Sequence, residues 1–178
     1  MPDSAALLVA LAEYRTARRR FLEVLGCAPS NRDPLAEFAE RLTHAVLGGE
    51  LATNRVQKAY DLVTAAGETV QVRYLANPAK RWVNGHVVDF RSGVDLYALL
   101  VVEDLDAEAL LVFTRGGLPG LCTAFAKRHA QAGTTFQFLE ANYRSIAAAP
   151  ARYQALGLMF VDLKSTLLNA PTNATRPD

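Results

Sequence analysis

The sequence is poor in the residues that build most zinc and redox sites. It has two cysteines and three histidines in 178 residues. Cys27 and Cys122 lie far apart without CxxC spacing, and His44, His86 and His129 lack the HExxH spacing of zinc peptidases. We therefore expect no zinc site. Two such thiols are typical of reduced, buried side chains in a cytoplasmic protein.

Long apolar runs are also missing. None approaches the roughly 20 residues that a membrane-spanning helix needs. Residues 5–12 are all apolar, but Asp3 precedes them and the arginines follow, which reverses the charge order of a secretory signal peptide. The sequence therefore predicts neither a signal peptide nor a membrane anchor, and a cytoplasmic location is expected.

The chain lacks an excess of one charge and lacks the common nucleotide-binding and hydrolase motifs. Nineteen basic and 18 acidic residues give a formal net charge of +1. Nucleic-acid binding would therefore need a local basic patch rather than a polycationic surface. No GxGxxG, GxxxxGK[ST] or GxSxG pattern occurs, so a dinucleotide fold, a P-loop and a serine-hydrolase elbow are not expected.

What the sequence does contain fits one domain. A chain of 178 residues that is 51% hydrophobic can bury a full core. Helices are predicted over 5–25 and from Pro34, capped by Asp33, to Gly48-Gly49. Further strands are predicted at 86–90, 95–102, 109–114 and 134–139, with a short helix from 118, a weak helix at 152–158 and an apolar stretch at 159–163. The fold class is therefore α/β, a single domain over 1–168 with a mixed central sheet flanked by helices, followed by a disordered tail at 169–178.

The most informative stretch runs from Gln57 to Tyr74 and reads as a β-hairpin. Gly67 lies in the connection, where it can adopt positive φ. Side chains alternate along a strand, so Gln71 and Arg73 point to the same face. Asp61 on the partner strand reaches that face if the register allows. The hairpin thus predicts an acid, an amide and a permanent cation on one patch.

Two readings of this patch are open from the residues alone. Carboxylate and amide oxygens beside a cation are a suitable ligand set for Mg²⁺ at a phosphodiester, since the metal polarises the phosphoryl group and a cation stabilises the developing charge. Alternatively, Asp61 and Arg73 form a solvent-exposed ion pair on an edge hairpin, contributing less than about 1 kcal/mol.

The order of these residues resembles the PD-(D/E)xK nuclease superfamily, in the restriction-endonuclease-like group. The resemblance covers a core from about 34 to 115, with the N-terminal helix, 1–26, outside it. It rests on three segments: Glu37-Phe38-Ala39-Glu40 on a helix, Tyr60-Asp61-Leu62 at a strand, and Gln71-Val72-Arg73 as the final motif. Arg73 departs from that family's lysine, and Gln71 is the uncharged variant of the acidic position.

The resemblance implies a role for each residue. Asp61 would be the principal ligand of Mg²⁺ or Mn²⁺, and Gln71 would supply its side-chain carbonyl. Glu40 would be the helix carboxylate, with Glu37 as its rival. Arg73 would stabilise the transition state, although arginine cannot exchange a proton near neutral pH as lysine can.

The expected function is a metal-dependent DNA endonuclease of restriction-like type. Lys58, Lys80, Arg81 and Trp82 are the candidate DNA contacts, although Trp82 also suits a hydrophobic plug beneath a loop. Cutting both strands requires two sites, so a homodimer is expected, with the N-terminal helix as a candidate surface. Two alternatives are kept: the same fold without catalysis, as a DNA-binding or protein-interaction module, and a small-molecule-binding α/β protein.

Overall fold

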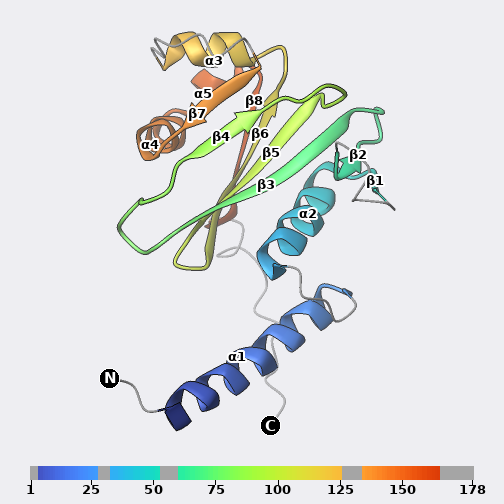
Figure 1. The fold of residues 1–178 in the computed structure, drawn as a ribbon. Coiled ribbons are helices and arrows are strands. Elements are labelled where there is room, and N and C mark those ends of the chain that lie inside the picture. Colours follow the sequence, from blue (N-terminus) through green and yellow to red (C-terminus); the bar gives the residue numbers. More distant parts are fainter. Residues whose placement is uncertain (1–3, 28–32, 53–59, 126–133, 165–178) are drawn as a thin grey trace.

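The computed structural model describes residues 4–27, 33–52, 60–125 and 134–164 (Figure 1). The helices are α1 (Ser4–Val24), α2 (Pro34–Leu47), α3 (Leu118–Ala124), α4 (Glu140–Ala148) and α5 (Pro150–Gln154). The strands are β1 (Glu50–Leu51), β2 (Leu62–Val63), β3 (Thr69–Asn77), β4 (His86–Asp89), β5 (Leu96–Glu103), β6 (Asp106–Thr114), β7 (Thr135–Phe138) and β8 (Leu158–Asp162).

The main sheet has six strands in the order β1-β2-β3-β5-β6-β8. β3 and β5 run parallel, and the other neighbouring pairs are antiparallel. All of β5 except its last residue is buried, as a continuous apolar run predicts for a central strand. The protein is thus a single mixed α/β domain with a mixed central sheet and helices, which confirms this part of the predicted fold class.

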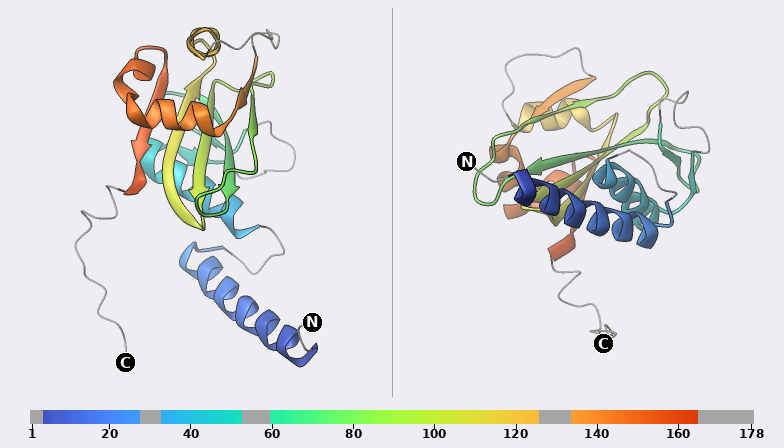
Figure 2. Two further views of the ribbon diagram at one scale, coloured as in Figure 1. Left: turned by 90° about the vertical axis from the view of Figure 1, so that its left-hand side faces the viewer. Right: turned by 60° about the horizontal axis from the view of Figure 1, so that its bottom comes forward.

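Two hydrophobic cores lie on opposite faces of this sheet. α2 covers one face (Figures 1 and 2), where Ala39 packs with Val72 and Leu100. On the other face, Tyr97 and Leu99 of β5 join the core formed with the two-stranded β4–β7 sheet and the helices after β6. Neighbouring residues of β5 therefore serve different cores. Burying each large apolar side chain contributes about 1.5–3 kcal/mol.

Local signals fix α2 and the edge beside it. The Asp33 carboxylate accepts a hydrogen bond from the Leu35 amide at 2.9 Å, and Gly48 ends the helix at φ 71°. Gly49 follows at φ 91°, and a Cβ there would lie 2.0 Å from the Val63 carbonyl oxygen. Only glycine therefore allows β1 to approach β2 at this turn.

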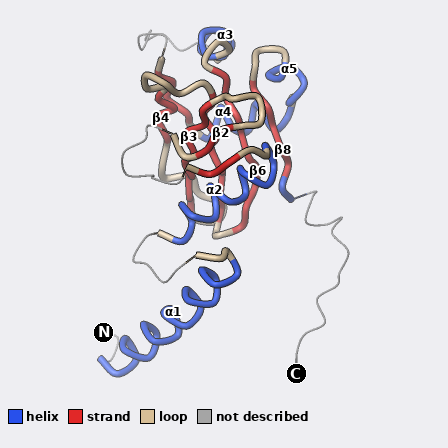
Figure 3. Tube along the Cα trace, turned by 90° about the vertical axis from the view of Figure 1, so that its right-hand side faces the viewer, coloured by secondary structure: helices blue, strands red, loops and turns tan. Residues whose placement is uncertain are grey.

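Helix α1 extends beyond the layered body of the protein (Figure 3). Near its C-terminal end, Leu22 is buried and Phe21 lies 5.9 Å from Phe38 of α2, between ring centroids. Leu7, Leu11 and Tyr14, in contrast, are each more than half exposed. None of the helices in the described part of the chain has the length and apolar character needed to cross a membrane.

The structure corrects several details of the predicted elements. Helix α4 was not predicted, and the apolar stretch at 159–163 is a strand, β8, at the edge of the main sheet. Within α2, Glu37 is buried and Val46 is exposed, the reverse of what residue type alone favours. Residues 57–59 of the predicted first hairpin strand, and the predicted tail at 169–178, lie outside the described residues.

Candidate functional site

The register of the β2–β3 hairpin brings the predicted patch together. Leu62 pairs with Val70, so Asp61, one residue earlier, lies opposite Gln71. The Asp61 amide donates to the Val70 carbonyl at 2.8 Å, and Gly67 turns the chain at φ 84°. Alternation along β3 then places Arg73 on the same face as Gln71. The sequence prediction that these three side chains share one face is confirmed.

The Asp61 carboxylate is the centre of this arrangement. Its Oδ2 atom accepts hydrogen bonds from Gln71 Nε2 at 2.5 Å and from the Val72 backbone N–H at 2.7 Å. Arg73 Nη1 lies 3.6 Å from the same oxygen and also donates to the Val72 carbonyl at 2.7 Å. Two hydrogen-bond donors and one ion-paired guanidinium thus converge on one buried oxygen, which is how proteins stabilise a desolvated carboxylate.

This pair is not the exposed ion pair of the alternative interpretation. Asp61 is 8% exposed and Gln71 6% exposed, although the Arg73 side chain remains 45% exposed. A charge taken out of water at this depth is costly unless it is hydrogen-bonded, so the Gln71 amide and the Val72 N–H are needed to hold it. Asp61 is therefore a fixed, buried anion with a solvent-reaching cation beside it.

The orientation of Gln71 differs from the one expected for a metal ligand. The resemblance implied that the Gln71 side-chain carbonyl would face a bound metal ion, whereas in the structure the Gln71 NH₂ group donates to Asp61. A carboxylate oxygen at 2.5 Å can only face the donor end of the amide. Gln71 would have to turn its amide over to act as a ligand, and that role stays a prediction.

The two candidate helix glutamates have separate surroundings. Glu37 is buried, and Cys27 Sγ lies 3.6 Å from its Oε2 atom, next to the end of α1. Glu40 is half-buried, with its Oε2 atom inaccessible to solvent. Helix α2, which carries both, packs on the sheet face opposite to Gln71 and Arg73. The assignment of Glu40 as a partner of Asp61 therefore also stays a prediction.

The candidate DNA contacts are at the far end of β3. Six residues of extended chain, about 20 Å, separate Gln71 from Asn77, and the loop with Lys80 and Arg81 follows (Figure 1). Both side chains are exposed. Trp82 instead packs inward, with its ring centroid 5.3 Å from that of Tyr143. This agrees with the alternative prediction that Trp82 is a hydrophobic plug beneath the loop. Lys58 lies outside the described residues.

A polar pocket next to Asp61 was not predicted from the sequence. Its lining comes from β3, β4, β5 and the segment after β4, and includes Gln71, Arg73, His86, Val87, Asp89, Arg91 and Tyr97. The parallel register pairs Gln71 with Tyr97, and His86 Nε2 lies 2.7 Å from the Tyr97 hydroxyl. Tyr97 is the one residue with a polar side-chain atom between Leu96 and Val102, which is the signal that could have suggested it. We call this group of residues the Arg73–Arg91 pocket.

Burial and charge set the protonation states in the pocket. Desolvation lowers the pKa of His86 below its usual 6.5, and the nearby Arg73 guanidinium lowers it further. Burial raises the pKa of Tyr97 to about 12, although Arg73 acts in the opposite direction. At neutral pH the pocket therefore holds a neutral imidazole and a protonated phenol between two arginines.

The residues present suit a hard divalent cation only in part. Within the described ranges, no three His, Cys, Asp or Glu side chains are grouped to hold a metal ion. The hydrogen bonds described for the Asp61 carboxylate both end on Oδ2, so a cation would bind through Oδ1. Mg²⁺ often takes one or two carboxylates and keeps several waters. The described residues therefore offer one carboxylate oxygen and no grouped set of metal ligands.

Comparison of the sequence with protein-family models and with curated proteins finds no match.

Proposed function

We propose that this protein is a metal-dependent DNA endonuclease of restriction-like type, with Asp61 at the centre of its active site. The observation that supports the proposal is the convergence of Gln71 and Arg73 on the buried Asp61 carboxylate, in the chain order that the nuclease resemblance requires. The partly exposed Arg73 side chain connects this buried anion to an accessible polar pocket.

Mg²⁺ or Mn²⁺ would be held by Asp61 Oδ1, and Gln71 would join as a ligand only after turning its amide over. Glu40, the other ligand that the resemblance implies, lies on α2 across the sheet, so it would need a rearrangement of α2 to reach the same ion. When bound, such an ion polarises the phosphoryl oxygen and lowers the pKa of a coordinated water. Asp61 supplies the negative charge that attracts the cation. The hydrogen bonds from Gln71 and from the Val72 N–H fix the direction of the carboxylate.

Arg73 contributes charge stabilisation. Its contacts with Asp61 and with the Val72 carbonyl both use Nη1, so the remaining N–H groups of the guanidinium can donate to phosphate oxygens. Because the guanidinium stays charged, Arg73 stabilises negative charge in the transition state and does not act as a base.

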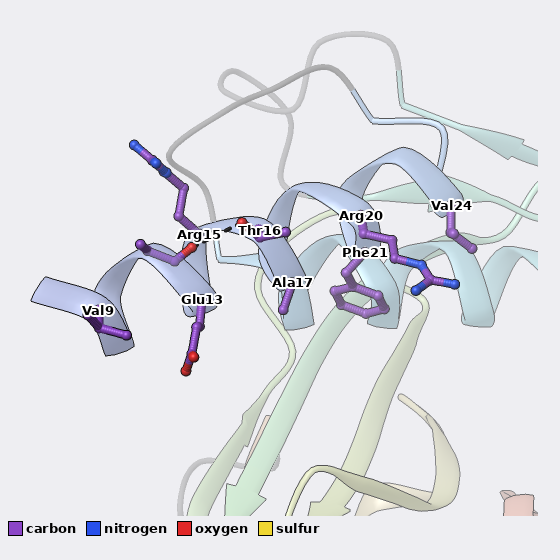
Figure 4. A pocket seen from close by; sticks show the side chains of 9 residues that line it. Val9, Glu13, Arg15, Thr16, Ala17, Arg20, Phe21 and Val24 are labelled. Carbon is purple, nitrogen blue, oxygen red and sulfur yellow. Dashed lines mark hydrogen bonds between the residues drawn. The ribbon is translucent and has the colours of Figure 1, made fainter. Parts of the chain in front are cut away.

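We further propose that two copies associate through α1. The exposed Leu7, Leu11 and Tyr14 follow one another at spacings of four and three, the pattern of residues that join paired helices. A pocket on the same helix is lined by residues between Val9 and Val24 (Figure 4). Two paired sites would allow cleavage of both DNA strands.

The test is cleavage of mixed-sequence duplex DNA with Mg²⁺, with Mn²⁺ and with EDTA, comparing wild type, Asp61→Asn and Asp106→Ala. Asp61→Asn keeps the size and an acceptor oxygen but removes the charge, so the hairpin is expected to fold. Metal-dependent cleavage lost in Asp61→Asn and retained in Asp106→Ala, an exposed control, supports the proposal. Equal cleavage in all three proteins would refute the assignment of Asp61.

The second candidate is a catalytically inactive module of the same fold that binds DNA. The orientation of Gln71 favours it, because an amide donor rather than an oxygen ligand faces Asp61. This candidate predicts salt-sensitive DNA binding that neither EDTA nor Mg²⁺ changes. Binding measured by fluorescence anisotropy over a salt series, together with the cleavage assay, distinguishes the two.

A further inference from the structure

The Arg73–Arg91 pocket is large enough for a small anion and has more donors than acceptors. Its volume is 270 Å³, roughly nine times the 30 Å³ that one water occupies in the liquid. Arg73 lies on β3, Tyr97 on β5, and His86 at the start of β4, so three strands contribute to it. Arg91 completes the pocket from the segment after β4.

Both guanidiniums keep donors for a ligand. The contacts described for Arg73 use Nη1, and the contact of Arg91 with Asp89 uses Nε, at 3.5 Å. The Arg91 side chain is 69% exposed and can move over a bound group. Its backbone is held, since Arg115 donates from Nη2 to the Arg91 carbonyl and from Nε to that of Val94 at 2.8 Å. The Arg91 backbone is therefore fixed, while its exposed side chain keeps room to adjust to a ligand.

The Tyr97–His86 pair adds one more donor in either tautomer. The neutral imidazole and the phenol carry two polar hydrogens between them, and their mutual hydrogen bond uses one. If Tyr97 donates to Nε2, the Nδ1–H of His86 is left, and if Nε2–H donates, the Tyr97 hydroxyl hydrogen is left. One hydrogen is therefore available to an acceptor whichever tautomer is present.

The charges that face the pocket also favour an anion. Arg73 and Arg91 contribute two positive charges, and Asp89 contributes one negative charge that its contact with Arg91 partly offsets. Asp61 lies behind Arg73 with its Oδ2 atom already hydrogen-bonded. We propose that this pocket is a phosphate-binding subsite, formed by Arg73 and Arg91 with the Tyr97–His86 pair, and that it receives a phosphate group of a nucleic acid.

The identity of the anion as a nucleic-acid phosphate rests on the proposed function, whereas the anion site itself does not. Arg73 belongs to both sites, since its guanidinium contacts Asp61 and lines the pocket. A phosphate held in the pocket would therefore neighbour the one presented to Asp61. A phosphate bound in this subsite would position the nucleic-acid strand relative to Asp61. Its negative charge would also partly offset the positive charge of Arg73.

The first experiment titrates the metal-free protein with sodium sulfate at constant ionic strength and pH 7.5, and follows the His86 ring signals by NMR. Sulfate itself remains a dianion at this pH, so the titration adds no change in the protonation of the ligand. Saturable shifts are expected.

Arg91→Gln should weaken sulfate binding at least tenfold, because a charged hydrogen bond contributes about 1.5–3 kcal/mol. Tyr97→Phe should weaken it about fivefold. Arg152→Gln removes the same charge from an exposed position on α5 and should change little. Thermal melts verify folding of each variant.

Shifts that do not saturate, or equal weakening by Arg91→Gln and Arg152→Gln, would refute the anion site. Competition against sulfate then identifies the source of the phosphate. An oligonucleotide with a 5′-hydroxyl tests internal phosphates, the 5′-phosphorylated form tests a terminal one, and inorganic phosphate tests the free ion. Competition by either oligonucleotide supports the proposal, and competition by inorganic phosphate alone would refute its nucleic-acid part. Asp61→Asn should retain saturable sulfate binding, at equal or higher affinity because it removes a negative charge beside Arg73, so loss of cleavage and loss of the subsite are distinguishable.

Discussion

Replacing Gln71 by glutamate tests both the geometry around Asp61 and its proposed metal. Gln71 Nε2 donates to Asp61 Oδ2 at 2.5 Å, so Gln71→Glu places a carboxylate oxygen where the structure has a donor. Both groups are nearly inaccessible to water. Without metal, the variant brings two negative charges into contact and loses a charge-assisted hydrogen bond. With a divalent cation, the same two carboxylates become a ligand pair.

The size of the effect follows from Coulomb's law. Two unit charges 3 Å apart repel by about 5 kcal/mol at an effective dielectric constant of 20. Rotation of the glutamate and sharing of one proton reduce this value, so we expect Gln71→Glu to lower the free energy of unfolding by about 2–4 kcal/mol at pH 8 in EDTA. Repulsion raises the pKa of one carboxyl in the folded state. The loss therefore shrinks as the pH falls and that group takes up a proton.

Urea unfolding in EDTA and in Mn²⁺ measures both parts. A metal at 100 times its dissociation constant should restore about 2.7 kcal/mol. Gln154→Glu, on the exposed side of α5, is the control and should change stability by less than about 0.5 kcal/mol. If Gln71→Glu is as stable as wild type in EDTA at pH 8, the amide does not face a buried carboxylate. If it is destabilised and no metal rescues it, Asp61 is not a metal ligand.

Three further predictions concern the association of two copies, the pocket and the core. Leu11→Glu should convert the expected dimer to a monomer in sedimentation velocity, because it places a charge in the exposed apolar face of α1; a persistent dimer would refute that interface. Because burial and Arg73 lower the pKa of His86 below 6.5, the unfolded chain binds a proton there more readily, and stability falls as the pH drops below about 6.5. His86→Gln should flatten this part of the curve of unfolding free energy between pH 7.5 and 5.5, and an unchanged curve would contradict the assignment. Leu100→Ala, at a fully buried position facing α2, should cost about 2–5 kcal/mol in urea unfolding; a smaller loss would mean that the α2 core collapses around the cavity.

The elements that could be predicted from the sequence are those with local signals. Asp33-Pro34 and Gly48-Gly49 mark both ends of α2, because capping and positive φ depend on residue type alone. The apolar run at β5 is long enough to require burial on both faces. The β2–β3 hairpin follows from alternation and one glycine. The same local signals are enough to group Asp61, Gln71 and Arg73, because their contacts lie within one hairpin.

The elements that were missed lack a recognisable local signal or depend on contacts distant in sequence. The N-cap of helix α4 is Leu139, a residue that offers no capping oxygen, and the Asn142 side chain accepts from the Leu139 amide instead. β8 becomes a strand only by pairing with β6. The Arg73–Arg91 pocket likewise needs the parallel β3–β5 register and the placement of β4 over it. No residue spacing within one segment encodes that placement.

If the protein is the nuclease proposed above, its two departures from the motif of that superfamily are physically linked. With glutamine at 71, the pair of buried Asp61 and partly exposed Arg73 is neutral overall, so the folded protein tolerates Asp61 without a metal. An acidic residue at 71 would leave a net negative charge there and make a divalent cation part of the stable structure. Arginine at position 73 suits the site with glutamine at 71, because its guanidinium cannot lose its proton and always balances the Asp61 charge. Wild type should therefore need more Mg²⁺ or Mn²⁺ for cleavage than Gln71→Glu does, and its fold should be insensitive to EDTA.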